Sequence, residues 1–487
     1  MVAPNVTSRV IDRSFGTPRS GAAVSGIVIH SDRGPTEITQ VTSVDRFVQL
    51  YGEPKSNRPT MYSVIQILKD SSRVKVLRVV DDAAAATVDI EEGADTTFTI
   101  NAANPGAWGN NISVTFGKGG SDTDLFDLNV FFNGDPVETY RVSKLDDKKD
   151  GFGNSVYIED AINGNSDYIE IDDNPSVSTK PETLIDSGDE TDLTGGSNDS
   201  ATPSDGDIAT AWDEFNNTAD VNVDFLVNGG WANSTVQTKM IEIAQTRGDC
   251  FAFLDVPEAD DSVSAMVDYV DPQSADLNAN TSFAAVYGHW VRQYDEFNDR
   301  EINVAPSAVA AGVATRSRAQ DEIWAAPAGV RRGRVNAIGV TNVFNGAELD
   351  TLYENNINPI TQLPGQGLVV WGQKTLQRTA SALDRINVRF VVTHIQNVLR
   401  EALVPFIFQG NTEFERENIT ALADGFLEDI QTRQGLFDFR VICDESNNTP
   451  EVIDRNELIV DVFIKPTRTA EFIKLNVILT PTGVDFN

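Results

Sequence analysis

The hydrophobic pattern along residues 21–86 predicts strands that alternate with helices. A short apolar strand at 24–30 is followed by a helix from about Ser43 to Tyr51. A second helix near 61–69 leads into a strand at 74–80, which is rich in β-branched residues. Alternation of this kind indicates one part of an α/β domain.

Between residues 87 and 220 the pattern changes to short strands separated by Gly, Asn and Asp turns. Such a change within the chain predicts a separate β-rich domain inserted into the first one. The strands expected here are 96–100, 112–116, 125–132 and 156–158.

The end of this region is strongly acidic. Residues 170–224 hold fifteen acidic side chains and one basic side chain, Lys180. A segment of this composition is expected to form little core and to remain a solvated or flexible loop. Calcium binding is the alternative, but neither the EF-hand spacing nor a repeated Asp-Gly motif occurs, so no metal site is predicted.

Regular alternation of strands and helices returns between residues 221 and 345. This pattern predicts a largely parallel sheet covered on both faces. We expect residues 21–86 to complete the same α/β domain, with residues 87–220 inserted between its two pieces. The expected strands are 223–227, 251–254 and 283–287, and the expected helices are 234–247, 262–270 and 307–318.

Residues 346–470 hold the two clearest amphipathic helices and are assigned to a C-terminal α+β domain. The first helix has an apolar stripe from Leu383 to Leu399 at three- and four-residue spacing. The second begins with a possible capping box, Thr412 with Glu415, and ends at Gly435. Strands are expected at 439–443, 458–464 and 471–479.

The two ends of the chain resemble extended arms. Residues 1–20 lack sustained periodicity. Residues 471–487 are expected to hold a strand at 471–479, which alternates enough to pair as an added strand, and then a second arm after Pro481 and Gly483. The predicted fold class is therefore α/β and β multi-domain: an α/β domain with an inserted β-rich domain, a C-terminal α+β domain, and extended N- and C-terminal arms.

Composition agrees with several domains and limits the partners. The chain has 487 residues, 40% of them hydrophobic, which exceeds what one core usually holds. Its 73 acidic and 38 basic residues give a net charge of −35, which argues against direct binding of nucleic acid. A saline habitat, where salt screens repulsion between copies, and a hydrated acidic exterior kept for solubility are both open interpretations.

No membrane span or secretory signal is expected, because the chain lacks a run of 18 apolar residues and begins with a polar segment. We therefore expect a soluble chain made in a cytoplasm. The two cysteines, Cys250 and Cys443, are far apart and are interpreted as buried thiols.

The sequence offers little for catalysis. Only three histidines occur, His30, His289 and His394, and each has an ordinary structural interpretation. Nucleophile elbows, phosphate loops and dinucleotide fingerprints are all missing. The prediction is a protein that is not an enzyme, without catalytic residues, cofactor or metal.

A compact basic cluster, Arg331, Arg332 and Arg334, follows the turn at 325–329. Local salt bridges to the acidic surface would explain it. The other interpretation is a contact between subunits in which guanidinium groups pair with carboxylates.

Several motifs resemble, in order along nearly the whole chain, those of the contractile tail sheath proteins of tailed phages and related injection systems. Each motif is weak alone, but their shared order makes coincidence improbable. They are Gly26 to Pro35 with the helix ending in Tyr51-Gly52, Asn104 to Asn110, Leu193 to Gly196, Trp324 to Gly329, Asn356 to Ile360, Val370 to Leu376, Val441 to Asp444, Asn447 to Pro450, and Ile464 to Pro466.

The resemblance implies a structural subunit that forms stacked hexameric rings around an inner tail tube and contracts to drive the tube through the target envelope. Implied partners are further copies of the chain, the tube protein, and the baseplate and tail terminator proteins, in a virion tail assembled in the host cytoplasm. The C-terminal domain would face the tube, through the helix 412–434 in one hypothesis, and the inserted domain would face outward.

In this family the terminal arms add strands to the sheets of neighbouring subunits. The resemblance therefore implies inter-subunit contacts and hinges at specific residues. The contacts are Val6, Val10, Ile11, Arg331, Arg332, Arg334, Phe472, Leu475, Val477 and Leu479, and the hinges are Gly16, Pro18 and Pro466.

Three other functions stay open. A sheath of a bacterial or archaeal contractile injection system or tailocin would use the same mechanics. A static shell protein would form a lattice with one spacing, and an acidic α/β hydrolase would need a nucleophile and base that the sequence does not identify.

Overall fold

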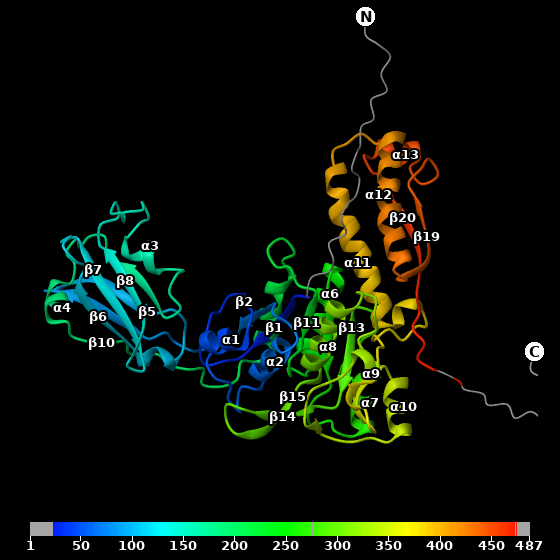
Figure 1. The fold of residues 1–487 in the computed structure, drawn as a ribbon, viewed down its shortest axis with the longest axis horizontal. Coiled ribbons are helices and arrows are strands. Elements are labelled where there is room, and N and C mark those ends of the chain that lie inside the picture. The colour runs from blue at the N-terminus through cyan, green and yellow to red at the C-terminus, as the bar shows by residue number, and fades with distance from the viewer. Residues whose placement is uncertain (1–22, 272, 275, 473, 475–487) are drawn as a thin grey trace, which may run out of the picture. The chain divides into compact units, whose positions relative to one another are not determined.

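The computed structural model describes residues 23–472, apart from 272 and 275, together with residue 474 (Figure 1). The described chain forms two compact units, one ending at Thr379 and one beginning at Ala380. The first contains an α/β domain and the inserted β-rich domain, and the second contains the C-terminal helices and strands. Each unit is described by itself.

The α/β domain is built on an eight-stranded sheet in the order β18-β17-β13-β12-β11-β1-β3-β2. Its six inner strands are parallel, and the two edge strands, β2 and β18, are antiparallel to their neighbours. The strands are β1 (Ser25–Ile29), β2 (Thr39–Val41), β3 (Val74–Arg78), β11 (Phe225–Val227), β12 (Phe251–Asp255), β13 (Ala284–Gly288), β17 (Ile357–Leu363) and β18 (Gly367–Val370).

Helices cover both faces of this sheet, because its central strands are apolar on both sides. Helices α2 (Pro59–Leu68) and α8 (Pro306–Gln320) pack on one face. Helices α6 (Ser234–Arg247), α7 (Val263–Val270) and α10 (Gly346–Glu354) pack on the other. The remaining elements of the domain are α1 (Val44–Tyr51), α5 (Asp205–Ala211), α9 (Gly329–Arg332), the 3-10 turn η2 (Trp212–Asn216), and a small sheet of β14 (Val291–Asp295), β15 (Arg300–Val304) and β16 (Gly339–Val340).

Local sequence signals explain where these helices begin and end. The side chain of Asn233 accepts a hydrogen bond from the N–H of Val236 and so caps α6, which ends at Gly248 with φ of 70°. Ser43 caps α1 and Ser262 caps α7 in the same way. For these reasons the helices expected at 43–51, 234–247 and 262–270 are confirmed to within a residue at each end.

The inserted domain consists of two antiparallel sheets. One has three strands in the order β4-β5-β9, and the other has four in the order β10-β6-β7-β8. Their inward residues form one continuous core that includes Phe98, Phe116 and Phe126. The elements are β4 (Thr87–Glu92), β5 (Asp95–Ala102), β6 (Ile112–Lys118), β7 (Leu125–Phe132), β8 (Asp135–Ser143), β9 (Ile169–Asp173), β10 (Thr191–Asp192), α3 (Ile158–Ile162), α4 (Glu182–Ser187) and the 3-10 turn η1 (Ala107–Asn111).

Two predictions for this region are wrong. Residues 156–158 do not form a strand; Ile158 begins the short helix α3, and Tyr157 makes only an isolated bridge to Ser143. The acidic segment 170–224 is not a structureless loop either. Most of its acidic side chains stay outside, although those of Asp173 and Asp199 are buried. The buried apolar residues of the segment enter the two cores, and they are Ile171, Ile185, Leu193, Ile208, Trp212, Phe215, Val221 and Val223.

Two arginines hold the inserted domain to the α/β domain. The guanidinium of Arg78 donates hydrogen bonds to the carbonyl oxygens of Ser31 and Gly34, both at 2.9 Å, and of Pro105 at 2.8 Å. Burial lowers the pKa of Arg78 to about 10, so the group remains a cation at neutral pH. Arg33 lies over the ring of Trp108 at 4.5 Å, and Phe132 and Tyr168 complete an aromatic cage around it.

Asp255 ends β12 at the carboxyl edge of the parallel strands and is fully buried. It accepts hydrogen bonds from the backbone N–H of Ser307 at 2.6 Å, the hydroxyl of Ser307 at 2.7 Å and the N–H of Gly230 at 3.0 Å. The cluster ties the end of β12 to the start of α8 and to the loop before α6. Burial raises the pKa of Asp255 to about 6, although these hydrogen bonds act in the opposite direction.

The C-terminal unit pairs two long helices with a two-stranded sheet. Helix α11 (Ile386–Leu403) contacts α12 (Glu413–Thr432), and α12 packs on β19 (Leu436–Ile442). Strand β20 (Asp461–Pro466) is antiparallel to β19. Two 3-10 turns, η3 (Ala382–Asp384) and η4 (Val404–Phe406), and the short helix α13 (Pro450–Asp454) complete the unit. Thr412 caps α12, as the sequence predicts.

Two groups of elements lie across the predicted domain boundaries. Residues 205–216 pack on α6 and beneath the large sheet, although the inserted domain was expected to extend to 220. Strands β17 and β18 belong to the same sheet, although the C-terminal domain was expected to begin at 346. A boundary after Thr379 is therefore the one that we propose.

Substitution of Gly106 tests the junction between the two domains of the first unit. Gly106 has φ of 142°, and a Cβ atom there would collide with the carbonyl oxygen of Asp32. Gly106→Ala is expected to lower the free energy of unfolding by about 3 kcal/mol. Gly346→Ala is the control, because its Cβ would enter open space, and it should change stability by less than about 0.5 kcal/mol. Equal urea midpoints for the two variants would contradict the assignment.

Titration of Asp255 should leave a pH signature in stability. Its pKa is raised from 3.8 to about 6 in the folded chain, so its contribution to stability is complete below pH 3.8 and is lost as the pH rises through 6. The loss is on the order of 3 kcal/mol. Asp255→Asn cannot titrate. Between pH 4 and 7, the unfolding free energy of the unsubstituted chain, measured in urea, should therefore fall relative to that of the variant. Parallel curves would exclude this titration.

Candidate assembly surfaces

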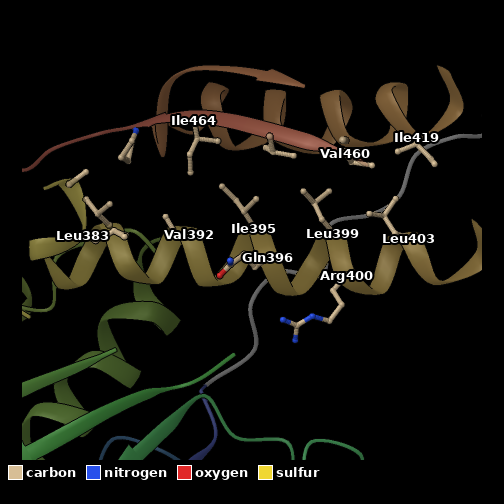
Figure 2. Close-up of a pocket in the computed structure, with 15 residues that line it drawn as sticks. Leu383, Val392, Ile395, Gln396, Leu399, Arg400, Leu403, Ile419, Val460 and Ile464 are labelled. Atoms are coloured by element: carbon tan, nitrogen blue, oxygen red, sulfur yellow. The ribbon is translucent and has the colours of Figure 1, made fainter. Parts of the chain in front are cut away.

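The C-terminal unit carries an apolar groove of about 610 Å³ between α11 and β20. Figure 2 shows side chains of α11 on one wall and those of β20 on the other, with Ile419 of α12 at one end. Its lining residues are mainly aliphatic: Ala382, Leu383, Val388, Val392, Ile395, Gln396, Leu399, Arg400, Leu403, Ile419, Ala423, Val460, Val462, Ile464 and Pro466.

The wall formed by α11 is a stripe of aliphatic residues at helical spacing. Val392, Ile395 and Leu399 lie at its centre, with Val388 and Leu403 on either side. The sequence predicted this stripe as the packing face of the helix. Part of that face is open to the groove, since Val392 is only half-buried.

The opposite wall is the free edge of a small sheet. Within the described residues β20 pairs with β19 alone, so its second edge has no strand beside it. Side chains alternate along β20: Val462, Ile464 and Pro466 line the groove, whereas Phe463 on the other face is 56% exposed. An apolar groove beside an unpaired strand edge is suited to accept an added strand.

The chain after β20 is anchored beside the start of α11. Glu471 accepts a hydrogen bond from Nε of Arg385 at 2.7 Å. Phe472 follows and is 77% exposed. The predicted contact residue Phe472 therefore presents an apolar ring to solvent in the single chain.

The structure describes only some of the predicted site residues. Pro466, a predicted hinge, is the last residue of β20 and lines the groove. The other arm positions lie outside the described residues, and their predicted roles stay predictions. These positions are Val6, Val10, Ile11, Gly16, Pro18, Leu475, Val477 and Leu479.

The basic cluster after residue 329 makes local contacts. Arg331 and Arg332 both pair with Asp321, the first at 3.5 Å. The Nε of Arg334 donates to the carbonyl oxygen of Val330 at 2.9 Å. Local salt bridging thus accounts for part of the cluster, while the Arg331 side chain remains 78% exposed.

The carboxyl edge of the parallel sheet, where α/β proteins usually bind ligands, is filled by the protein itself. The hydroxyl of Ser307 donates a hydrogen bond to Asp255 there, and both residues are completely buried. His30 bonds Asp199 at 3.1 Å, His289 packs on Phe344, and both are buried. Over the described ranges, clusters of three or more metal-ligating side chains are absent. In the same residues, none of the helices is both long and apolar enough to cross a membrane.

Sequence reasoning missed the groove, although its walls were predicted as elements. The stripe on α11 and the strand near 458–464 were both assigned from their patterns. Apolar periodicity marks a face that avoids water, but it does not tell which element covers that face. The available signal was that the predicted helices and strands of this unit have more apolar faces than they can cover among themselves.

Two family models match adjacent parts of the chain. The phage tail sheath protein central domain matches residues 201–376, and the phage tail sheath C-terminal domain matches residues 378–480. The division between them falls beside the boundary between the two compact units.

Curated relatives give the same family. The tail sheath protein of Vibrio phage KVP40 is 31% identical over 77% of this chain and 58% of the relative. The tail sheath protein of Enterobacteria phage T4 is 30% identical over 82% of this chain and 62% of the relative. The chain thus spans about three fifths of the length of these relatives.

Solved structures share the fold at low sequence identity. The sheath tail protein Lin1278 of Listeria innocua has a TM-score of 0.63 and 13% identity, and the match covers 92% of this chain and 96% of that one. The sheath of the extracellular contractile injection system PVC in its contracted state has a TM-score of 0.58 and 16% identity, with coverages of 98% and 97%. These matches confirm the mixed α/β multi-domain part of the predicted fold class, and the extended arms stay a prediction.

The matched families and relatives are structural sheath proteins, which confirms the prediction that the chain is not an enzyme. Together, the two adjacent sheath domains and the sheath fold establish that this chain belongs to the phage tail sheath protein family.

Proposed function

We propose that this chain is the structural subunit of a contractile tail sheath. Copies would polymerise as stacked hexameric rings around an inner tube and contract to drive the tube through the target cell envelope. The observation that carries the proposal is the apolar groove beside β20, which pairs with β19 alone among the described residues. This groove would accept a strand from another copy.

The chain contains a segment whose pattern fits this acceptor. In the sequence, Ile473, Leu475, Val477 and Leu479 are apolar and occupy every second position. In an extended strand these side chains lie on one face, which would enter the groove while the backbone bonds to β20. The exposed ring of Phe472 and the anchor of Glu471 on Arg385 stand at the start of that segment.

The N-terminal arm would supply a second link through Val6, Val10 and Ile11. Gly16 and Pro18 would form the hinge of that arm, and Pro466 the hinge of the C-terminal one. Each added backbone hydrogen bond contributes about 0.5 to 1.5 kcal/mol net. A strand of several bonds is therefore weak alone but strong when repeated through a lattice, and the hinges would let subunits rotate without losing it.

Arginine contacts would add to the strand links. The exposed Arg331 side chain, with Arg334 beside it, is free to reach carboxylates of a neighbouring acidic copy, and Arg332 would support it from its pair with Asp321. Guanidinium and carboxylate groups pair in a fixed geometry, which favours one register between copies.

The remaining parts of the proposal concern place and partners. The C-terminal unit would face the tube and the acidic inserted domain would face outward, in a virion tail assembled in the host cytoplasm. Baseplate and tail terminator proteins would bind the two ends of the stack. A phage tail is favoured over an injection system because the relatives with about 30% identity are phage proteins, whereas the injection-system matches share only the fold.

Electron cryomicroscopy of the purified chain, alone and on its native particle, tests the proposal. Stacked hexameric rings in two states, one long and narrow and one short and wide, are expected. Imaging should cover several salt concentrations, because the net charge of −35 on each copy opposes assembly in dilute buffer. A lattice with a single spacing in every condition would indicate a static shell, and monomers that never bind a tube would refute a sheath.

A charge placed in the groove should block assembly without unfolding the subunit. Val392→Glu puts a carboxylate on the half-buried groove wall, where an added apolar strand would desolvate it. Sedimentation is expected to show monomers with an unchanged circular dichroism spectrum. Ala421→Glu, on the exposed face of α12, is the matched control and should assemble normally. Normal tubes from Val392→Glu would mean that the groove is not the acceptor.

A further inference from the structure

A lysine and an aspartate meet inside the inserted domain, between its two sheets. Lys144 directly follows β8 of the four-stranded sheet, and Asp173 ends β9 of the three-stranded sheet. Their side chains are only 3% and 2% exposed. The Nζ of Lys144 donates to Oδ1 of Asp173 and also to the carbonyl oxygens of Thr97 at 2.8 Å and Asn174 at 3.3 Å.

Further polar groups contact Asp173, and a buried aromatic ring lies near the amine of Lys144. The hydroxyl of Tyr157 donates to the second carboxylate oxygen, Oδ2 of Asp173, at 3.0 Å. The backbone N–H of Asp173 donates to Oε1 of Glu159 at 2.7 Å. The ring of Phe98, which is completely buried, lies 5.8 Å from Nζ. Amine and carboxyl group are thus fixed in contact, away from bulk water.

We propose that Lys144 and Asp173 become joined by an amide bond that links the two sheets covalently. A proton first passes from Nζ to Oδ1, which leaves a neutral amine and a carboxylic acid. Nζ then attacks Cγ of Asp173, and the C–N bond forms as the C–O π bond opens onto Oδ2. Nζ loses a second proton to the Oδ1 hydroxyl, the Cγ–Oδ1 bond breaks, and one water leaves. The carbonyl at Oδ2 re-forms, and no oxidant or reductant is required.

Tyr157 is placed to assist this reaction. Its hydroxyl donates a hydrogen bond to Oδ2 of Asp173, the oxygen that becomes negative in the tetrahedral intermediate. A hydrogen-bond donor in an oxyanion hole has the same role. Burial, together with the hydrogen bond to Asp173, raises the pKa of Tyr157, so the hydroxyl keeps its proton. Glu159 positions Asp173 through the backbone and does not touch the reacting atoms in this structure.

Confinement favours the bond for two physical reasons. Holding the two groups in contact makes the reaction intramolecular, which removes most of the entropic barrier between separate reactants. Excluding water from the site protects the amide from hydrolysis once the water has left. The ion pair of Lys118 with Asp186 is a useful comparison, because its side chains are 74% and 65% exposed. These two groups are neither held in place by a core nor shielded from water. A covalent link between the sheets would resist forces that separate them.

Intact-mass spectrometry of the denatured full chain tests the proposal. The chain is expected to be lighter than its sequence by one water, and a tryptic digest should contain a branched peptide that joins the segments with Lys144 and Asp173. Lys144→Arg, which keeps a positive charge but no amine, should restore the full mass. Asp173→Asn should reach the same final mass as the unsubstituted chain, because ammonia leaves in place of water.

Further variants separate this reaction from other causes of the same mass loss. Lys118→Arg is the control and should retain the loss of water. Tyr157→Phe should leave a fraction at the full mass that declines with time, which a purely structural role of the hydroxyl would not produce. A loss of water that survives Lys144→Arg would instead indicate a succinimide, for example at Asp150-Gly151. That result, or an unsubstituted chain at its full mass, overturns the proposal.

Discussion

Backbone hydrogen-bonding groups along the outer edge of β20 are the constraint on which the C-terminal unit depends. A strand edge needs a partner, and in the part of the chain that the structure describes β20 pairs with β19 alone. Beside this edge, the side chains on one face of β20 point toward aliphatic side chains of α11. Water can form hydrogen bonds with the backbone groups of this edge, but contact between water and the aliphatic side chains of the groove is unfavourable. A strand with alternating apolar side chains satisfies both at once, and the chain carries such a segment directly after β20.

Charge is divided between the exterior and the interior of the first unit. Acidic residues crowd the outside of the inserted domain, while two of the cations that attach it, Arg78 and Arg33, are buried. Arg78 donates hydrogen bonds to three carbonyl oxygens from two segments, 31–34 and the turn at Pro105, and Arg33 lies against aromatic rings. A guanidinium can satisfy several neutral acceptors at once, so Arg78 is held by carbonyl oxygens alone. The junction also contains one ion pair, in which Arg46 of α1 contacts the carboxylate of Asp167 at 2.5 Å.

The parallel sheet acts as a scaffold because its usual ligand site is closed. Asp255, Ser307 and the N–H of Gly230 occupy the carboxyl edge and satisfy one another. The same polar groups, if reachable, would suggest catalysis. Their complete burial leaves them a structural role, which agrees with membership of a family of assembly proteins.

The sequence by itself determined most of the local elements and the family, because caps such as Ser43, Asn233 and Gly248 and the stripe on α11 are read from neighbouring residues. It did not determine that residues 205–216 complete the core beneath the large sheet, or that β17 and β18 extend that sheet. Nor could it reveal that α11 and β20 leave a groove or that Lys144 meets Asp173. These features depend on contacts between residues far apart in the chain, and periodicity reports which face avoids water but not what that face meets. Only the tertiary structure decided those partners.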